Sequence, residues 1–218
     1  MKEHPFLYHK KVFIIPILLL FTCWLIYFIE IQFGFNFNKY GIYPKTIKGL
    51  RGVIFSPFIH SNFKHLFNNS IPLLVMLGCL YYFYGKIATK VLVFGLLLTG
   101  VITWLIARPS YHIGASGIVY LLVSFIFFSG VFRRYYRLIA LSLVVVFLYG
   151  SMIWYIFPVE ERISWEGHLS GFVVGFVFAL FFRKLGPQPE LFIYTENKEF
   201  DMLFDENGNF VQEEDQVE

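Results

Sequence analysis

The chain has 218 residues, of which 57% are hydrophobic, 21% aromatic and only 15% charged, and its formal net charge is +3 at pH 7. A soluble globular domain is about 45–50% apolar and about 25% charged, so this composition excludes an ordinary soluble domain. The apolar excess lies in long runs, which indicates an integral membrane protein.

Six segments are long and apolar enough to cross a bilayer as helices. A spanning helix needs about 20 apolar residues, with a usual range of about 17–25. The segments are 12–31, 65–84, 91–107, 113–132, 138–158 and 168–185. The second is the weakest, because polar residues and a proline crowd its start. We therefore expect an all-α membrane protein with six transmembrane helices.

Basic residues favour one orientation of these helices. They gather in the N-terminal stretch, in alternate connections and after the last segment: Lys2, Lys10, Lys11, Lys86, Lys90, Arg133, Arg134, Arg137, Arg183 and Lys184. The short connections on the opposite side hold only Arg108 and Arg162. The positive-inside rule then predicts that both termini are cytoplasmic. The long loop 32–64 carries five more basic residues, but long loops count less in this rule.

The chain divides into three parts by composition. Residues 1–11 form a cytoplasmic N-terminus, 12–185 the six-helix core, and 186–218 an acidic cytoplasmic tail. The tail holds ten of the fifteen acidic residues and one lysine, so its net charge is −9 while the remainder carries +12. A turn is expected between Phe204 and Phe210. No small-x-small cleavage site follows the first apolar run, so we expect an uncleaved first helix.

Ser116 and His168 are the candidate catalytic residues. Ser116 lies in the first turn of the fourth segment, and His168 opens the sixth. With the N-terminus inside, both side chains face the outer leaflet, where a hydroxyl and an imidazole could act as nucleophile and general base. Small residues repeat every four positions beside His168, at Gly167, Gly171, Gly175 and Ala179. Such a stripe allows a second helix to approach closely in a membrane.

Three further residues extend this cluster. His65 and Asn69 are four residues apart at the start of the second segment, so they share one helix face, and both can donate hydrogen bonds. Asn68 borders that face, so spacing prefers Asn69 only weakly. Tyr120 is one turn below Ser116, where its ring could lie against His168. A lone serine in a membrane helix usually bonds back to its own helix, whereas three polar clusters at one leaflet favour a function.

These residues resemble the rhomboid family of intramembrane serine proteases. The matching motifs are Gly114-Ala115-Ser116-Gly117, Tyr120, Gly167-His168 with Gly171 and Gly175, and His60 with His65-Leu-Phe-Asn-Asn69. Leu50-Arg51 stands where rhomboids often carry Trp-Arg, in a loop thought to lie at the lipid interface. The resemblance implies a six-helix rhomboid-like bundle over about residues 10–185.

The resemblance also implies a role for each residue. Ser116 would be the nucleophile and His168 the general base. His65, Asn69 and the backbone amide of Ser116 would bind the oxyanion. Gly114 would leave room for the substrate backbone, and Tyr120 would pack on His168. The expected activity is that of a serine endopeptidase acting on transmembrane protein substrates within the lipid bilayer.

No cofactor, metal or nucleic-acid partner is expected, and the pattern defines no oligomeric state. The two cysteines, Cys23 and Cys79, lie inside apolar segments without metal-site spacing. We expect a multi-pass protein of a bacterial plasma (inner) membrane. The alternative is a non-catalytic relative that binds transmembrane helices as a chaperone or adaptor, although such relatives typically lack the serine or the histidine. A transporter would predict charges near the bilayer midplane, and the segments have essentially none.

Overall fold

The computed structural model of the protein describes residues 10–161, 163–189 and 198–210, and over these residues it forms helices without a β-strand. The α-helices are α1 (Lys11–Phe33), α2 (Ile47–Leu50), α3 (Gly52–Phe55), α4 (Phe63–Phe83), α5 (Gly85–Ile106), α6 (Ser116–Arg133), α7 (Tyr136–Tyr149), α8 (Trp165–Phe181) and α9 (Lys198–Asp201). Three 3-10 helices lie between them: η1 (Asn38–Tyr40), η2 (Ser56–Phe58) and η3 (Gly150–Ile156).

Five helical runs in the described residues are long and apolar enough to cross a membrane: Lys11–Phe33, Phe63–Phe83, Gly85–Ile106, Ser116–Arg133 and Tyr136–Ile156. The remaining apolar helix, α8, has 17 residues and stands at the short end of the range for a spanning helix. The predicted all-α membrane fold is confirmed, with five long apolar helical runs and this shorter apolar helix among the described residues. The chain is a multi-pass membrane protein.

The helix ends differ from the predicted ends where local backbone chemistry outweighs hydrophobicity. α4 starts early because the side chain of Asn62 accepts a hydrogen bond from the backbone N–H of His65 at 2.9 Å. α6 starts late, at Ser116, because Gly114 has a φ of +107° and cannot be helical. The predicted segment 138–158 is α-helical only in its first part and then tightens into η3.

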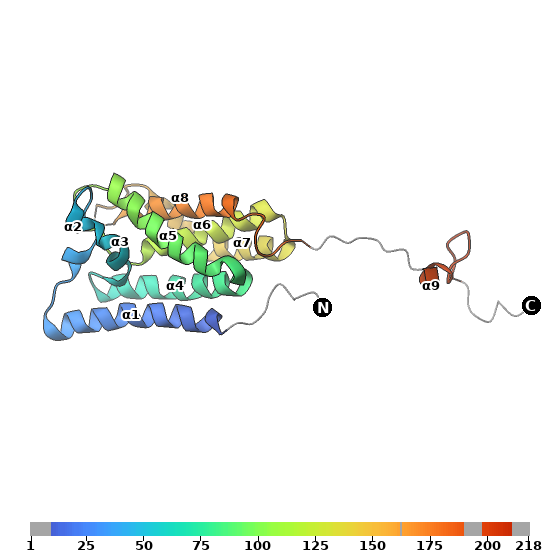
Figure 1. Cartoon of the computed structure of the whole chain (residues 1–218), viewed down its shortest axis with the longest axis horizontal. Coiled ribbons are helices and arrows are strands. Elements are labelled where there is room, and N and C mark those ends of the chain that lie inside the picture. The colour runs from blue at the N-terminus through green and yellow to red at the C-terminus, as the bar shows by residue number, and fades with distance from the viewer. Residues whose placement is uncertain (1–9, 162, 190–197, 211–218) are drawn as a thin grey trace, which may run out of the picture.

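A single residue, Tyr84, separates α4 from α5, so α5 begins six residues before its predicted start. Lys86 and Lys90, expected in a connection, lie instead in the first turns of α5. They remain at the end of the bundle where α1 begins and α8 ends (Figure 1). The side assigned to them by sequence is therefore unchanged.

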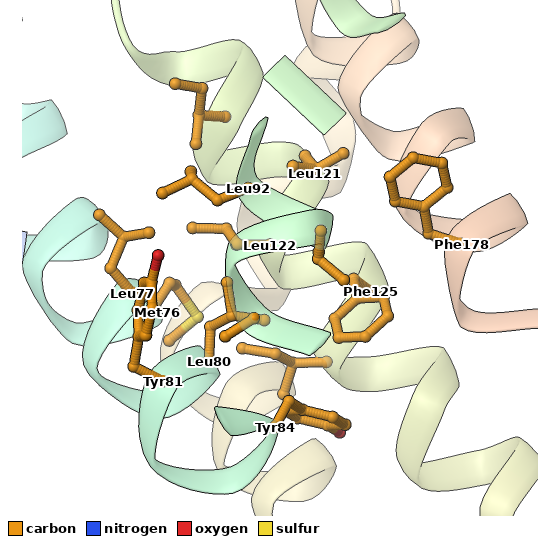
Figure 2. Packing of buried hydrophobic residues seen from close by; sticks show 14 of the residues in the cluster. Met76, Leu77, Leu80, Tyr81, Tyr84, Leu92, Leu121, Leu122, Phe125 and Phe178 are labelled. Carbon is orange, nitrogen blue, oxygen red and sulfur yellow. The ribbon is translucent and has the colours of Figure 1, made fainter. Parts of the chain in front are cut away.

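α6 lies inside the bundle, and its apolar side chains form the core with neighbouring helices. Figure 2 shows Leu121, Leu122 and Phe125 of α6 within this cluster. The buried partners from α4, α5 and α8 are Met76, Leu77, Leu80, Tyr81, Leu92 and Phe178. α1 packs on α4 at the side of the bundle (Figure 1). Several of its outward side chains are more than half exposed: Phe13, Ile17, Phe21 and Phe28. That apolar outer surface suits contact with lipid.

Small residues hold α6 and α8 in backbone contact. A Cβ added at Gly171 would strike the carbonyl oxygen of Gly117, and one at Gly175 would strike that of Leu121. A Cβ at Gly117 would come within 3.4 Å of the carbonyl oxygen of Gly167. The predicted small-residue stripe is thus the contact between the two helices that carry Ser116 and His168.

The long segment between α1 and α4 folds over one end of the bundle, where α2 and α3 lie (Figure 1). Two hydrogen bonds attach it to α5: Lys45 N–H donates to the carbonyl of Trp104, and the indole side chain of Trp104 donates to the carbonyl of Thr46. Apolar side chains on this segment are exposed, namely Ile47, Leu50, Ile54 and Phe55. These side chains suit a lipid-interface position for the loop.

The predicted turn near the C-terminus is confirmed. Phe204 and Phe210 form an antiparallel bridge around it, and the Asp205 carboxylate accepts hydrogen bonds from the backbone N–H groups of Asn207 and Asn209 at 2.8 Å. A hydrogen bond from the Asn209 side-chain amide, together with these backbone bonds, lowers the pKa of Asp205. Residues 1–9 of the predicted N-terminal segment and residues 190–197 and 211–218 of the predicted acidic tail lie outside the described residues.

Gly171→Ala should lower the thermal stability of the protein in detergent, because the new Cβ has no room against the α6 backbone. Overpacking of this kind typically costs about 1–3 kcal/mol. Gly78→Ala, also inside a membrane helix, is the control, because its added Cβ meets nothing closer than the Val12 carbonyl oxygen at 4.0 Å. Equal unfolding temperatures for the two variants would contradict the backbone contact.

Candidate active site

Ser116 is held at the start of α6 by the loop that precedes it. Main-chain bonds pair Ile42 with His112 in both directions, at 2.8 and 3.0 Å. Gly114 N–H donates to the carbonyl of Ser56 at 2.9 Å. The loop before the candidate nucleophile is therefore attached to the segment between α1 and α4, which limits its freedom.

His168 lies in the first turn of α8, and its Nε2 is 2.9 Å from Ser116 Oγ. Its other ring nitrogen, Nδ1, lies 2.9 Å from the main-chain carbonyl of Tyr155 in η3. A carbonyl oxygen only accepts, so Nδ1 carries the hydrogen and Nε2 offers a lone pair to the serine hydroxyl. His168 is 8% exposed, whereas Ser116 is half-buried, so the histidine is the more shielded member of the pair.

Tyr120 stacks on His168, with ring centroids 4.2 Å apart and planes inclined by 12°. Its hydroxyl donates to the carbonyl of Met152 at 2.7 Å. Two main-chain carbonyls of η3, those of Met152 and Tyr155, thus hold the imidazole and the ring beside it. Sequence reasoning anticipated the stacking but had no signal for these carbonyls, because main-chain acceptors leave no mark on residue type.

His65 and Asn69 converge on the backbone beside Gly114. A Cβ at Gly114 would lie 2.6 Å from His65 Nε2 and 3.7 Å from Asn69 Nδ2. Asn69 is 7% exposed and uses one amide hydrogen on the carbonyl of His65 at 3.1 Å, which leaves the second amide hydrogen for a ligand. Asn68 is exposed. The tertiary structure therefore separates the two asparagines that helical spacing barely distinguished.

His60 is a buried residue to which sequence reasoning gave no separate role. It is 1% exposed, and its Nε2 accepts a weak hydrogen bond from the backbone N–H of Ala115 at 3.4 Å. Burial, with a smaller contribution from nearby His65, lowers the pKa of His60 to about 4. His60 is consequently neutral at pH 7 and able to accept a bond from the loop that carries Ser116.

A cavity of about 40 Å³ borders Ser116 and is lined on its polar side by Thr99, Thr103 and Ser164. The Thr99 hydroxyl is buried without a hydrogen-bond partner. A water molecule needs about 10–15 Å³ of such space, so the cavity has room for about three. Among the described residues, no group of three or more His, Cys, Asp or Glu side chains could hold a metal ion.

Glu166 is the acidic residue closest in sequence to His168, but its carboxylate binds Arg108 instead. Its Oε1 accepts a bond from the backbone N–H of Arg108 at 3.2 Å and lies 3.6 Å from the Arg108 Nε. No hydrogen bond joins it to His168, whose Nδ1 partner is the Tyr155 carbonyl. Within the described residues the serine and histidine therefore form a pair with no carboxylate hydrogen-bonded to it.

The fold and this cluster define a multi-pass helical membrane protein with a partly buried serine–histidine pair where two helices meet. The chain belongs to the rhomboid family, since the Rhomboid domain model matches residues 48–185, more than half of its length.

Similar proteins occur in mycobacteria. The uncharacterized protein Rv1337 of Mycobacterium tuberculosis is 40% identical over 159 residues, which are 67% of this chain and 65% of that protein. The uncharacterized protein ML1171 of Mycobacterium leprae is 37% identical over 145 residues, which are 60% of this chain and 55% of that protein. The matched region thus spans slightly less than two thirds of the length of the Rv1337 protein.

Proposed function

We propose that this protein is a serine endopeptidase that hydrolyses peptide bonds in or near transmembrane segments of membrane proteins. The observation that carries the proposal is the 2.9 Å distance between His168 Nε2 and Ser116 Oγ. Membership of the rhomboid family, whose members are usually intramembrane proteases, supports it.

In the first step, Ser116 Oγ attacks the carbonyl carbon of the scissile bond while its proton passes to His168 Nε2. The Tyr155 carbonyl accepts the Nδ1 hydrogen and keeps the Nε2 lone pair directed at the serine. The imidazolium then donates its proton to the leaving amine, and an acyl-enzyme forms. A main-chain dipole thereby does the orienting that a carboxylate does in a Ser-His-Asp triad.

The oxyanion of the tetrahedral intermediate is stabilised by the Ser116 backbone amide with His65 and Asn69. The Ser61 hydroxyl lies 3.3 Å from His65 Nδ1, and donation from this hydroxyl leaves the hydrogen on Nε2, the atom that faces Gly114. Gly114 has no Cβ, so the substrate backbone can approach these donors. Donors in a site of low dielectric constant are worth about 10²–10³ in rate each.

Water completes the reaction by hydrolysing the acyl-enzyme, with His168 acting as base. Lipid excludes water from most of the bundle, and the polar cavity beside Ser116 has room to hold the water that this step consumes. The substrate must present an unwound bond, because an intact helix shields its own carbonyl groups. Substrates with helix-breaking residues near the end of a transmembrane segment fit this requirement.

We also propose that both termini face the cytoplasm of a bacterium and that the core, residues 12–185, lies in the plasma membrane. Exposed basic residues support this orientation, because they gather where α1 begins and α8 ends: Lys10, Lys11, Lys86, Arg134, Arg137, Arg183 and Lys184. Residues 186–218 would then be an acidic cytoplasmic tail.

In sealed right-side-out vesicles, an added soluble protease should leave this tail intact, and it should remove the tail only after the membrane is permeabilised. The measurement is the size of the protein on a gel, and an epitope placed after residue 218 reports the loss of the tail. Removal of the tail before permeabilisation would mean that the proposed orientation is inverted.

Ser116→Ala and His168→Ala should each reduce cleavage of a transmembrane substrate by about 10³-fold or more, because neither half of the pair works alone. The double variant should be no worse than either single variant, since residues acting as one unit are non-additive. The measurement is turnover in detergent, with fluorophosphonate labelling of Ser116 as a second readout. Comparable cleavage by Ser116→Ala would end the serine-protease proposal and favour a binding role for the bundle.

Asn69→Ala should lower kcat by about 10²-fold with little change in KM, because its amide acts on charge that develops only in the transition state. Asn68→Ala is the matched control, since it removes the same side chain from the neighbouring exposed position. The measurement is steady-state cleavage of one peptide substrate by both variants. If Asn68→Ala lost as much activity as Asn69→Ala, or more, the assignment of Asn69 as the oxyanion donor would be wrong.

A further inference from the structure

A second polar cluster joins the two loops that lead into α6 and α8. His112 lies four residues before Ser116, and Ser164 lies four residues before His168. His112 Nδ1 and Ser164 Oγ are 2.6 Å apart, and His112 is 4% exposed. The link therefore joins the same two helix starts as the serine–histidine pair, four residues earlier in each chain segment.

The direction of this hydrogen bond follows from the other ring nitrogen. His112 Nε2 lies 3.0 Å from the main-chain carbonyl of Arg108, which can only accept. Nε2 therefore carries the hydrogen, and Nδ1 accepts from the Ser164 hydroxyl. Both ring nitrogens are occupied, so the imidazole is held in one orientation by Ser164 and Arg108.

Arg108 adds a second tie between the same segments. Its guanidinium donates to the carbonyls of Glu161 and Ile163, at 2.7 and 2.6 Å. Its backbone N–H donates to the carboxylate of Glu166, which is 1% exposed. The approach to α8 is thus bound to the approach to α6 through several directional contacts on one side of the site.

These ties complement the glycine contact between α6 and α8. Contact between small residues sets the distance between the two helix axes. Further along the helices, sliding of one past the other is opposed by the Ser124 hydroxyl of α6, which donates to the carbonyl of Phe172 in α8 at 2.7 Å. A hydrogen bond weakens steeply when its angle or length changes, so it opposes that sliding. A shift along the axis by about 1 Å would separate the imidazole from the serine hydroxyl and can cost about 10²-fold in rate.

We propose that His112 and Ser164 are positioning residues whose hydrogen bond sets the axial register of α6 against α8, and through it the Ser116–His168 geometry. This inference rests on the proposed function. Loss of the bond should slow reaction at each active site by about tenfold, and the remaining Arg108 ties should keep the protein folded. Because His112 and Ser164 contact each other directly, the effects of substituting them on the reaction rate should not be additive.

Two pairs of variants distinguish loss of the His112–Ser164 hydrogen bond from other effects of substituting these residues. Ser164→Ala removes the hydroxyl, and Ser164→Thr keeps it. His112→Asn keeps an acceptor at the position of Nδ1 and loses the donor to Arg108, whereas His112→Gln keeps the donor at the position of Nε2 and loses the acceptor. Each histidine variant breaks one ring contact, but only His112→Gln breaks the link to Ser164.

The readouts are the rate and the end point of fluorophosphonate labelling at Ser116, together with the unfolding temperature. Ser164→Ala and His112→Gln should label about tenfold more slowly than wild type, to the same end point. Ser164→Thr and His112→Asn should label near the wild-type rate. Adding Ser164→Ala to His112→Gln should cause no further loss, whereas adding it to His112→Asn should cause the full loss.

Wild-type labelling rates in Ser164→Ala and His112→Gln would overturn the inference. A lowered end point at an unchanged rate would do the same, because it reports fewer folded sites and thus a merely structural role. Wild type and Ser116→Ala, measured in parallel, test the proposed function separately: an unlabelled wild type would overturn that function and this inference with it. Labelled wild type with unaffected variants would overturn the inference alone.

Discussion

Backbone contact between α6 and α8 is the constraint on which the rest of the structure depends. Gly117 and Gly171 meet with no space for a Cβ, and Gly175 repeats the contact one turn further along. Apolar side chains gain little by leaving lipid for one another, so close van der Waals packing has to hold membrane helices together. Because these two helices meet so closely, a side chain as short as that of Ser116 reaches the imidazole of His168.

The site is completed by main-chain groups from segments outside α6 and α8. The carbonyls of Tyr155 and Met152 in η3 hold His168 and Tyr120, and the carbonyl of Ser56 holds the loop before Ser116. In surroundings of low dielectric constant an unpaired polar group is costly, so each of these groups needs a partner nearby. The 3-10 turn after α7 and the segment between α1 and α4 are therefore parts of the site.

Apolar and polar contacts fix different features of the α6–α8 pair. The glycines of α8 determine how far apart the helix axes lie, while bonds such as His112–Ser164 act along the axes and at the helix starts. The buried carboxylate of Glu166 belongs to this second group, since it binds the Arg108 backbone and leaves His168 to a neutral acceptor. The imidazole next to Ser116 is thereby oriented without a hydrogen-bonded carboxylate.

The sequence by itself determined the class of fold and the elements that carry the polar cluster. Run length and four-residue spacing are local properties, so they were enough to predict the membrane helices and the glycine stripe of α8. The alternating direction of successive helices also predicted that Ser116 and His168 lie at the same end of the bundle, where the two side chains meet. Helix ends were less predictable, because a cap at Asn62 and a positive φ at Gly114 depend on backbone geometry that hydropathy does not measure.

Only the tertiary structure decided how the polar groups pair. Asn69 turns inward and Asn68 outward because of the way α4 lies against its neighbours, which helical spacing cannot report. The partners of His168 and Tyr120 are main-chain carbonyls, and any residue type can supply a carbonyl. Contacts between segments more than fifty residues apart, such as His112 with Ser164, arise only when the chain has folded, because they depend on where the helices meet.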